Sequence, residues 1–222
     1  LILEQKLIIK MKYNHIVWDW NGTLLDDRWL CIEAINFVLK SREMRLVSNE
    51  EYRDLFCFPV IDYYEKLGFD FTKEHFPIPE FLEYYKNKFE ECSLHKNAEF
   101  VLKKISESGF TQSVLSAGKQ SSLLNWVKYH NIEFLFDQII GVDNEEASGK
   151  IDAGKSWLNS STIIPEQTLL LGDTIHDKEV AEALGFKCVL IDIGHVSTQR
   201  LAATGETVIS ELVSIIDYLN ID

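Results

Sequence analysis

Residues 16–27, IVWDWNGTLLDD, contain an apolar run that ends abruptly at an aspartate. Residues 16–18 suit a central strand buried on both faces of a parallel sheet, whereas Asp19, Asn21 and Gly22 end it with turn-forming residues. In open α/β sheets, ligands bind outside the carboxyl ends of the strands, where the strand order reverses. The segment therefore predicts a carboxylate at a ligand-binding edge, although a simple strand-ending turn would use the same residues.

A second apolar run, residues 169–171, ends in the same way at Asp173 after a glycine. Asp177 follows four residues later, where the apolar spacing predicts the start of a helix that ends at Gly185. Asp173 and Asp19 should converge at one sheet edge, supported by Asp177 and a main-chain carbonyl. Such an oxygen cluster suits Mg²⁺, and without a cation the carboxylates would repel each other. Asp177 could equally be a helix N-cap.

A strand expected at residues 112–115 lies between these motifs and is followed by Ser116, Ala117 and Gly118. A hydroxyl at this edge can donate to a phosphate oxygen, and a glycine frees the backbone to present N–H groups in a concave anion site. The same three residues are also typical of an ordinary loop, so they indicate a phosphate site only together with the other motifs.

A cation would complete a phosphate site, and Lys150 precedes the strand that ends at Asp173. Lys155 is the alternative. A lysine is usually a solvated surface charge, so Lys150 is favoured only because the carboxylates and the hydroxyl call for a positive partner.

In this order the motifs resemble the haloacid dehalogenase-like hydrolase superfamily, specifically the helical-cap branch that includes phosphoglycolate phosphatase-like proteins. The resemblance covers nearly the whole chain from Met11 onward. Its four motifs are residues 19–23 (DWNGT), Ser116, Lys150 and residues 172–177 (GDTIHD). No single motif is decisive, but their joint order is a strong signal.

The resemblance implies that Asp19 attacks phosphorus to form an aspartyl phosphate, a covalent intermediate that splits hydrolysis into two easier steps. It places Mg²⁺ on Asp19, Asp173 and the main-chain oxygen of Asn21, as a template that offsets charge. Asp177 would orient water, the metal or Lys150. The residues implied to hold the phosphoryl group are Trp20, Asn21, Ser116, Ala117, Gly118 and Lys150.

Asn21 departs from the family pattern. Phosphatases of the family usually carry a second Asp at this position, which protonates the leaving oxygen and later deprotonates the attacking water. An amide does not titrate in the relevant range. Because general acid–base catalysis contributes about 10² to 10⁴-fold, we expect slow turnover of alkyl phosphate esters. His176 and Asp26 are candidate substitutes.

Asn21 leaves three interpretations open. The first is a phosphatase whose substrate has a good leaving group, such as an acyl phosphate. The second is a C–P bond hydrolase that resembles phosphonoacetaldehyde hydrolase, which needs a cap lysine; none occurs between Lys40 and Lys66. The third is a phosphate-ligand binding or regulatory protein with little turnover, although such a protein would not need Asp19.

Composition restricts the partners. A formal net charge of −13 disfavours nucleic acid and anionic membranes, which would be repelled. A small phosphorylated metabolite, attracted locally by Mg²⁺ and Lys150, is the expected substrate. No run is long enough to span a membrane. The four cysteines lack Cys-x-x-Cys spacing, which favours reduced thiols in the cytoplasm. A monomer or small homo-oligomer is expected.

The expected architecture is a Rossmann-like, mostly parallel sheet core with an inserted helical cap domain. The core should comprise residues 11–23 and 95–222, the cap residues 24–94, and residues 1–10 a possible N-terminal extension. Further strands are expected at 138–142, 168–171, 187–191 and 207–209, alternating with helices. The cap is expected to act as a mobile lid that supplies substrate contacts. Its aromatic residues 55–64 are expected to pack between helices more than to line a pocket.

Overall fold

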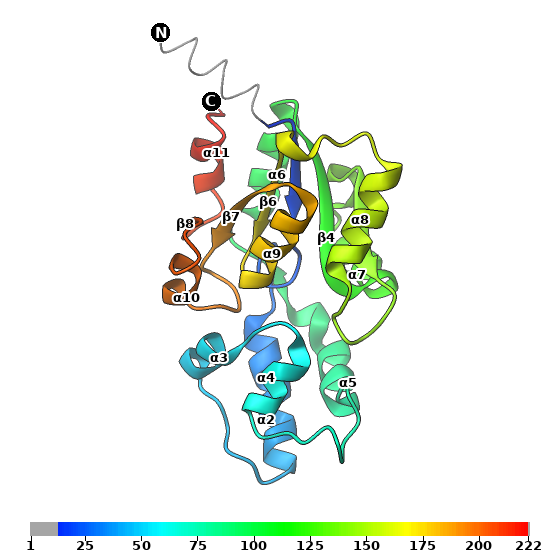
Figure 1. The fold of residues 1–222 in the computed structure, drawn as a ribbon, viewed down its shortest axis with the longest axis vertical. Coiled ribbons are helices and arrows are strands. Elements are labelled where there is room, and N and C mark those ends of the chain that lie inside the picture. Colours follow the sequence, from blue (N-terminus) through cyan, green and yellow to red (C-terminus); the bar gives the residue numbers. More distant parts are fainter. Residues whose placement is uncertain (1–12, 222) are drawn as a thin grey trace.

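Six parallel strands form the central sheet, in the order β5-β4-β1-β6-β7-β8 (Figure 1). The computed structural model describes residues 13–221, so Met11 and the possible extension of residues 1–10 lie outside the described residues. The predicted parallel α/β core is confirmed. The strands are β1 His15–Trp18, β4 Thr111–Lys119, β5 Gln138–Val142, β6 Thr168–Gly172, β7 Lys187–Ile191 and β8 Thr207–Ile209.

Helices cover both faces of this sheet because successive strand residues point to opposite sides. Ile16 and Trp18 of β1 join the cluster that packs against α6, α7 and α11, whereas Val17 joins the cluster against α8, α9 and α10. The core helices are α6 Ala98–Glu107, α7 Gln120–Tyr129, α8 Lys150–Ser160, α9 Ile175–Leu184, α10 Thr198–Ala202 and α11 Ser214–Tyr218, with short 3₁₀ turns η2 Glu133–Leu135 and η3 Pro165–Gln167.

The strand order reverses at β1. This strand pairs with β4 on one side and with β6 on the other, so that Trp18 is level with Val114 and with Leu171. Asp19, Ser116 and the residues after β6 therefore leave the sheet side by side. This is the switch point at which open α/β sheets bind ligands.

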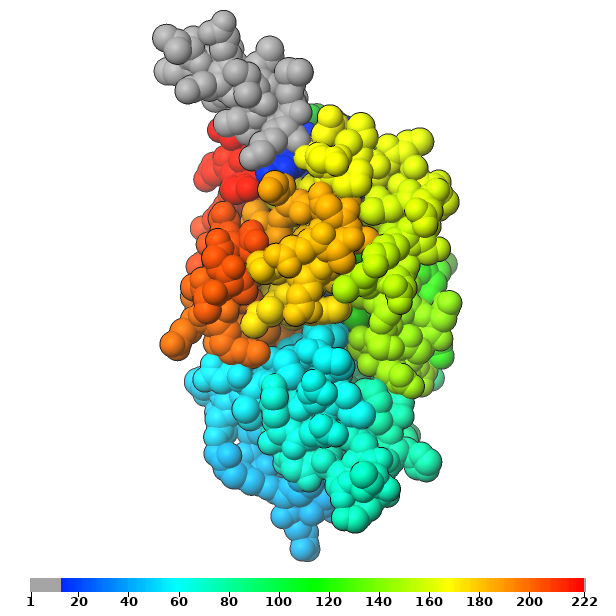
Figure 2. Space-filling view, in the orientation of Figure 1, coloured from blue at the N-terminus to red at the C-terminus, as the bar shows by residue number. Residues whose placement is uncertain are grey.

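A helical insert, residues 24–94, separates β1 from α6 (Figures 1 and 2). It begins and ends with two antiparallel two-residue strands, β2 and β3, which the sequence patterns did not indicate. Its helices surround their own apolar cluster. The elements are β2 Leu25–Asp26, α2 Arg28–Ser41, α3 Asn49–Leu55, α4 Val60–Lys66, α5 Pro79–Lys88, η1 Phe89–Glu91 and β3 Ser93–Leu94.

Two arginines join the insert to the loop after β7. Arg53 of α3 donates from Nη2 to the carbonyls of Asp192 (2.6 Å) and Val196 (2.9 Å). In return, Arg200 of α10 donates from Nη1 to the Phe56 carbonyl at 2.7 Å. These bonds hold the insert against the carboxyl edge of the sheet, where Figure 2 shows it as the lower part of the molecule.

Within residues 13–221, no helix has the length and apolar character needed to cross a bilayer. All four cysteines are free, as expected from their spacing.

Gly141 of β5 allows β5 to approach the turn that follows β4. A Cβ at this position would lie 2.6 Å from the Gly118 carbonyl oxygen and 2.8 Å from the Gln120 Cα, both backbone atoms. We expect Gly141→Ala to lower the free energy of unfolding by about 1–3 kcal/mol, measured by urea denaturation. Gly118→Ala, whose Cβ would meet only side-chain atoms at 3.2 Å or more, should cost less; an equal cost would contradict the explanation.

Candidate active site

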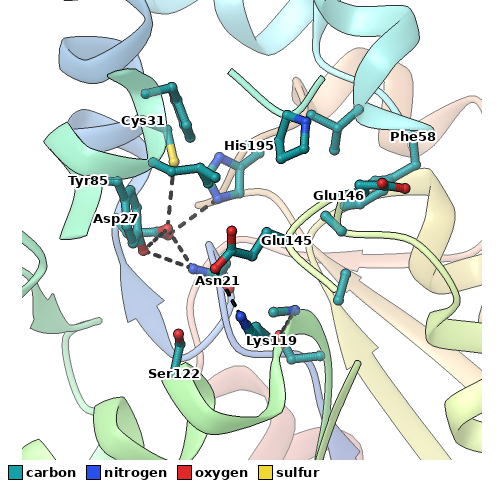
Figure 3. A pocket seen from close by; sticks show the side chains of 18 of the residues that line it. Asn21, Asp27, Cys31, Phe58, Tyr85, Lys119, Ser122, Glu145, Glu146 and His195 are labelled. Atoms are coloured by element: carbon teal, nitrogen blue, oxygen red, sulfur yellow. Dashed lines mark hydrogen bonds and ion pairs between the residues drawn. The ribbon is translucent and has the colours of Figure 1, made fainter. Parts of the chain in front are cut away.

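A cavity of about 670 Å³ lies between the helical insert and the carboxyl edge of the sheet. Figure 3 shows side chains from both parts of the chain around it. Asp173 and the Trp20 side chain are fully buried nearby. The predicted site residues that line the cavity are Asp19, Asn21, Ser116, Ala117, Gly118, Lys150 and Asp177.

Lys150 lies between two carboxylates. Its Nζ donates to Asp19 Oδ1 at 2.6 Å and to Asp177 Oδ1 at 2.5 Å, and its side chain is only 2% exposed. Burial would lower the pKa of Lys150, but the charges of Asp177 and Asp19 outweigh burial and raise it, so the ammonium stays protonated. A fixed ammonium beside Asp19 is suited to binding phosphoryl oxygens.

The start of α8 places this lysine. The helix begins at Lys150, directly after Gly149, whose φ is 85°. Gly154 lets α8 pack closely on α9, since a Cβ there would lie 2.6 Å from Leu184 Cδ1. The competing candidate, Lys155, lies on the exposed face of the same helix.

Asp177 is held by the first turn of α9. The N-cap residue is Thr174, so the alternative that Asp177 is itself the N-cap is wrong: it is the third helical residue of a capping box. Asp177 Oδ2 accepts from the Thr174 N–H (2.9 Å) and Oγ1 (2.7 Å), which leaves Oδ1 for Lys150. Burial favours the neutral acid, but Lys150 outweighs it and holds the pKa of Asp177 below its usual value.

Asp173 follows β6 and is fully buried close to Asp19. Its Oδ1 accepts from Thr23 Oγ1 at 3.1 Å, and its Oδ2 accepts from the main-chain N–H of His195. A Cβ on Gly22 would lie 2.4 Å from Asp173 Oδ2, so a glycine is required for the close approach of the first loop. Each carboxylate oxygen keeps a lone pair for a further partner.

The three carboxylates fit a divalent cation. Oxygens of Asp19, Asp173 and Asp177 all lie within 4.8 Å of one another, and each residue is buried. Burial raises the pKa of Asp19 to about 8, against the opposing charge of Lys150, and that of Asp173 to about 6, against His195. A bound cation would favour the charged forms. The main-chain oxygen of Asn21 makes no hydrogen bond within the described part of the chain, so it is free to join an oxygen-ligand set.

The turn within the long strand β4 supplies the hydroxyl. Ser116 Oγ accepts from the Gly118 N–H at 3.0 Å, and its own proton has no acceptor among residues 13–221. The main-chain N–H groups of Trp20 and Asn21 also lack a hydrogen-bond acceptor there. These donors and Lys150 are the groups available to a phosphoryl group beside Asp19.

Asp27 and Tyr85, whose roles the sequence did not indicate, fix the side chain of Asn21. Asn21 Nδ2 donates to Asp27 Oδ2 at 2.8 Å and to Tyr85 Oη at 3.0 Å, as Figure 3 shows. Tyr85 in turn donates to the same carboxylate oxygen at 2.8 Å. Asp27 is the residue before α2, and an acidic N-cap position was the only local signal for it.

His195 is a third residue of the site that the sequence did not indicate. Its Nε2 lies 3.3 Å from Asp27 Oδ1, and its Nδ1 is 2.9 Å from Tyr52 Oη. Burial would lower the pKa of His195, but Asp27 outweighs it and raises the pKa to about 9. Burial opposes ionisation of Asp27 as well, yet His195, Asn21 and Tyr85 hold its pKa below the usual value. The pair is therefore a buried ion pair.

The two candidate substitutes for the missing acid occupy different places. His176 lines the cavity, where its ring stacks on Phe58 at 4.8 Å and its Nδ1 pairs with Glu179 at 2.9 Å. Asp26 belongs to β2 and does not line the cavity. Neither makes a hydrogen bond to Asn21.

Sequence comparison identifies one family. The family model described as haloacid dehalogenase-like hydrolase matches residues 16–191, which include every candidate site residue named above except those after β7. No curated protein matches the chain.

Solved structures share the whole fold. A predicted phosphatase from Clostridium acetobutylicum superimposes with a TM-score of 0.81 at 19% identity, covering 93% of this chain and 98% of that one. A haloacid dehalogenase-like family hydrolase from Streptococcus pneumoniae gives 0.72 at 20% identity (94% and 99%). A predicted phosphoglycolate phosphatase from Haemophilus somnus gives 0.68 at 17% identity (93% and 98%). At these identities the likeness shows the fold.

Breaking the buried ion pair should destabilise the protein. We expect Asp27→Asn to lower the free energy of unfolding by about 3–5 kcal/mol, because His195 is left buried and charged without its partner. Urea denaturation below the ordinary histidine pKa of about 6.5 measures this. The exposed Asp54 is a matched control, and Asp54→Asn should change stability by less than about 0.5 kcal/mol. Similar costs for the two variants would argue against a buried ion pair.

Proposed function

Because the chain belongs to the haloacid dehalogenase-like hydrolase family, we propose that it is a phosphatase that forms an aspartyl phosphate at Asp19. The observation that carries the proposal is the buried contact between Asp19 and Lys150, beside Ser116 and open to a cavity. We further propose that the helical insert is a cap domain and that the substrate is a small phosphorylated metabolite. The free cysteines are in keeping with a reducing, cytoplasmic setting.

Each residue near Asp19 has a distinct part in this reaction. Asp19 Oδ attacks phosphorus, and the P–O bond to the leaving group breaks. Lys150, the Ser116 hydroxyl and the free N–H groups of Trp20 and Asn21 hold the phosphoryl oxygens and offset their charge, which is most of what phosphoryl transfer requires. Water then attacks the aspartyl phosphate, releasing inorganic phosphate and restoring the Asp19 carboxylate.

We propose Mg²⁺ as the cofactor, held by Asp19, Asp173 and the main-chain oxygen of Asn21. When bound, the ion supplies a Lewis acid that offsets the like charges of carboxylate and phosphate. Asp177 acts indirectly on the phosphoryl group, by fixing the position of the Lys150 ammonium.

A phosphate-binding protein with little turnover is the alternative from another class, and Asn21 favours it, since no titratable acid stands at that position. A C–P bond hydrolase would need a lysine of the insert in the cavity. Lys86 of α5 does line it, but from an exposed position. Borohydride trapping with an aldehyde substrate would detect a Schiff base there.

Covalent trapping tests the proposed nucleophile. With acetyl phosphate and Mg²⁺, rapid acid quench and intact-mass measurement should show the mass increase of one phosphoryl group, located on Asp19 by peptide mapping. Asp19→Asn should abolish the label, because an amide is not a nucleophile of this kind. The exposed-site variant Asp54→Asn should keep it. Label that persists in Asp19→Asn would disprove the assignment, and bound phosphate analogue without label or turnover would favour the binding protein.

Thermal unfolding tests the cation site without relying on activity. A ligand that binds only the folded state stabilises it by RT ln(1 + [L]/Kd), so Mg²⁺ at about 100 times Kd should add about 2.7 kcal/mol and raise Tm. We expect Asp173→Asn to lose most of this increase and Asp54→Asn to keep it. An equal Mg²⁺ response in Asp173→Asn would remove Asp173 from the ligand set.

A further inference from the structure

The Asp27 carboxylate determines which group Asn21 presents to the cavity. A carboxylate accepts hydrogen bonds and donates none, so the amide must turn its NH₂ group toward Asp27. Tyr85 donates its only proton to Asp27 and therefore accepts from Asn21. Both amide protons are thus used inside the protein. The remaining atom, Asn21 Oδ1, lies on the side of Gly118, 3.7 Å from where a Cβ on that glycine would be.

Asn21 can therefore accept a hydrogen bond from a substrate but cannot donate one. A leaving oxygen beside it receives no proton from this position. The P–O bond must then break with the electron pair leaving on oxygen, and that step is fast only for a stabilised oxyanion. A phenol of the tyrosine type has a pKa of about 10, far closer to neutrality than the 15.7 of water, which an aliphatic alcohol resembles.

The insert side of the cavity is aromatic. Phe56 and Phe58 come from the segment between α3 and α4, Tyr63 from α4 and Tyr85 from α5, and Trp126 of α7 completes the wall. Trp126 and Tyr85 meet edge to face at 5.8 Å, as Phe56 and Tyr63 do at 5.3 Å. Residues 55–64 were expected to pack between helices more than to line a pocket, and this segment does both. Such walls favour a flat, apolar ring, which stacks or packs edge-on.

Charge around the cavity argues against a small carboxylate-bearing substrate. Of the three lysines that line the cavity, Lys119 is paired with Glu145 at 3.0 Å, Lys150 is used by Asp19 and Asp177, and Lys86 is exposed. Glu146 also lines the cavity (Figure 3). A volume of about 670 Å³ is in the range of pockets that hold drug-sized molecules. An uncharged organic group fits these walls better than a second anion.

We propose that the substrate is an aryl phosphate, the phosphate monoester of a phenol. This deepens, and rests on, the proposed phosphatase activity. Asp19 Oδ attacks phosphorus, the bond from phosphorus to the phenolic oxygen breaks, and the phenolate leaves with the electron pair and takes a proton from solvent. Water then cleaves the aspartyl phosphate to inorganic phosphate. The aromatic wall binds the ring, and Asn21 makes the rate depend on the leaving group.

Three model substrates separate these two contributions. Phenyl and cyclohexyl phosphate are similar in size but differ in leaving group, while acetyl phosphate has a good leaving group and no ring. We expect kcat for phenyl phosphate to exceed that for cyclohexyl phosphate by at least about 10²-fold, the low end of what a general acid contributes. KM for acetyl phosphate should be at least about tenfold higher than for phenyl phosphate. Equal kcat values for the two esters, or equal KM values with and without the ring, would overturn the proposal.

Exchanging the amide and the carboxylate tests the role of Asn21. Asn21→Asp alone would place two carboxylates 2.8 Å apart, so it is combined with Asp27→Asn. The double variant should raise kcat for cyclohexyl phosphate relative to phenyl phosphate by about tenfold or more, compared with Asp27→Asn alone, which shares the unpaired His195. An unchanged ratio would show that the proton at the leaving oxygen does not depend on this position.

Failure of this proposal can be distinguished from failure of the proposed function. Label from acetyl phosphate on Asp19 without an aryl preference rejects the substrate class alone, whereas absence of any label rejects the phosphatase.

Discussion

The contact of Lys150 with Asp19 and Asp177 is the interaction on which the site depends, because it holds three charged groups in a site that is almost fully buried. Four carboxylates meet in this region, those of Asp19, Asp27, Asp173 and Asp177, and the buried cations that face them are Lys150 and His195. Negative charge is thus left over in surroundings that penalise it, which is why burial raises the pKa of Asp19 and Asp173. A divalent cation would balance the remaining charge.

The strand order brings the side chains of the site together, and each strand or helix needs only its ordinary local geometry to hold them. Asp19 and Asp173 follow neighbouring strands that run in parallel, and α8 and α9 meet on one face through the glycine of α8. Each side chain is fixed by its own element: a strand end for Asp19 and the helix-capping box for Asp177. The site therefore needs few contacts that are made only for function.

Site residues whose position depends on a single strand or helix could be predicted from the sequence. Site residues whose position depends on contacts between different elements could not. The ends of β1, β6 and the helix before Gly185 are local patterns, so Asp19, Asp173 and Asp177 were found in the right place. The sequence does not distinguish Asp27 from Asp26, because two adjacent aspartates look alike. Only the turn from β2 into α2 determines which of the two carboxylates faces Asn21. His195 reaches Asp27 from a loop that no spacing rule connects with it.

Hydrogen bonds between the insert and the sheet edge couple the position of the insert to the orientation of the Asn21 side chain. Asn21 at the sheet edge donates to Asp27 and Tyr85 of the insert, and Tyr52 on α3 bonds to His195, so these bonds run between the insert and groups at the sheet edge. The arginine bonds around Arg53 close the same interface. Movement of the insert away from the sheet would break these bonds together and free the Asn21 amide. Asn21 is therefore limited to accepting a hydrogen bond only while the aromatic wall covers the cavity, which is the arrangement that would hold the proposed aromatic ring.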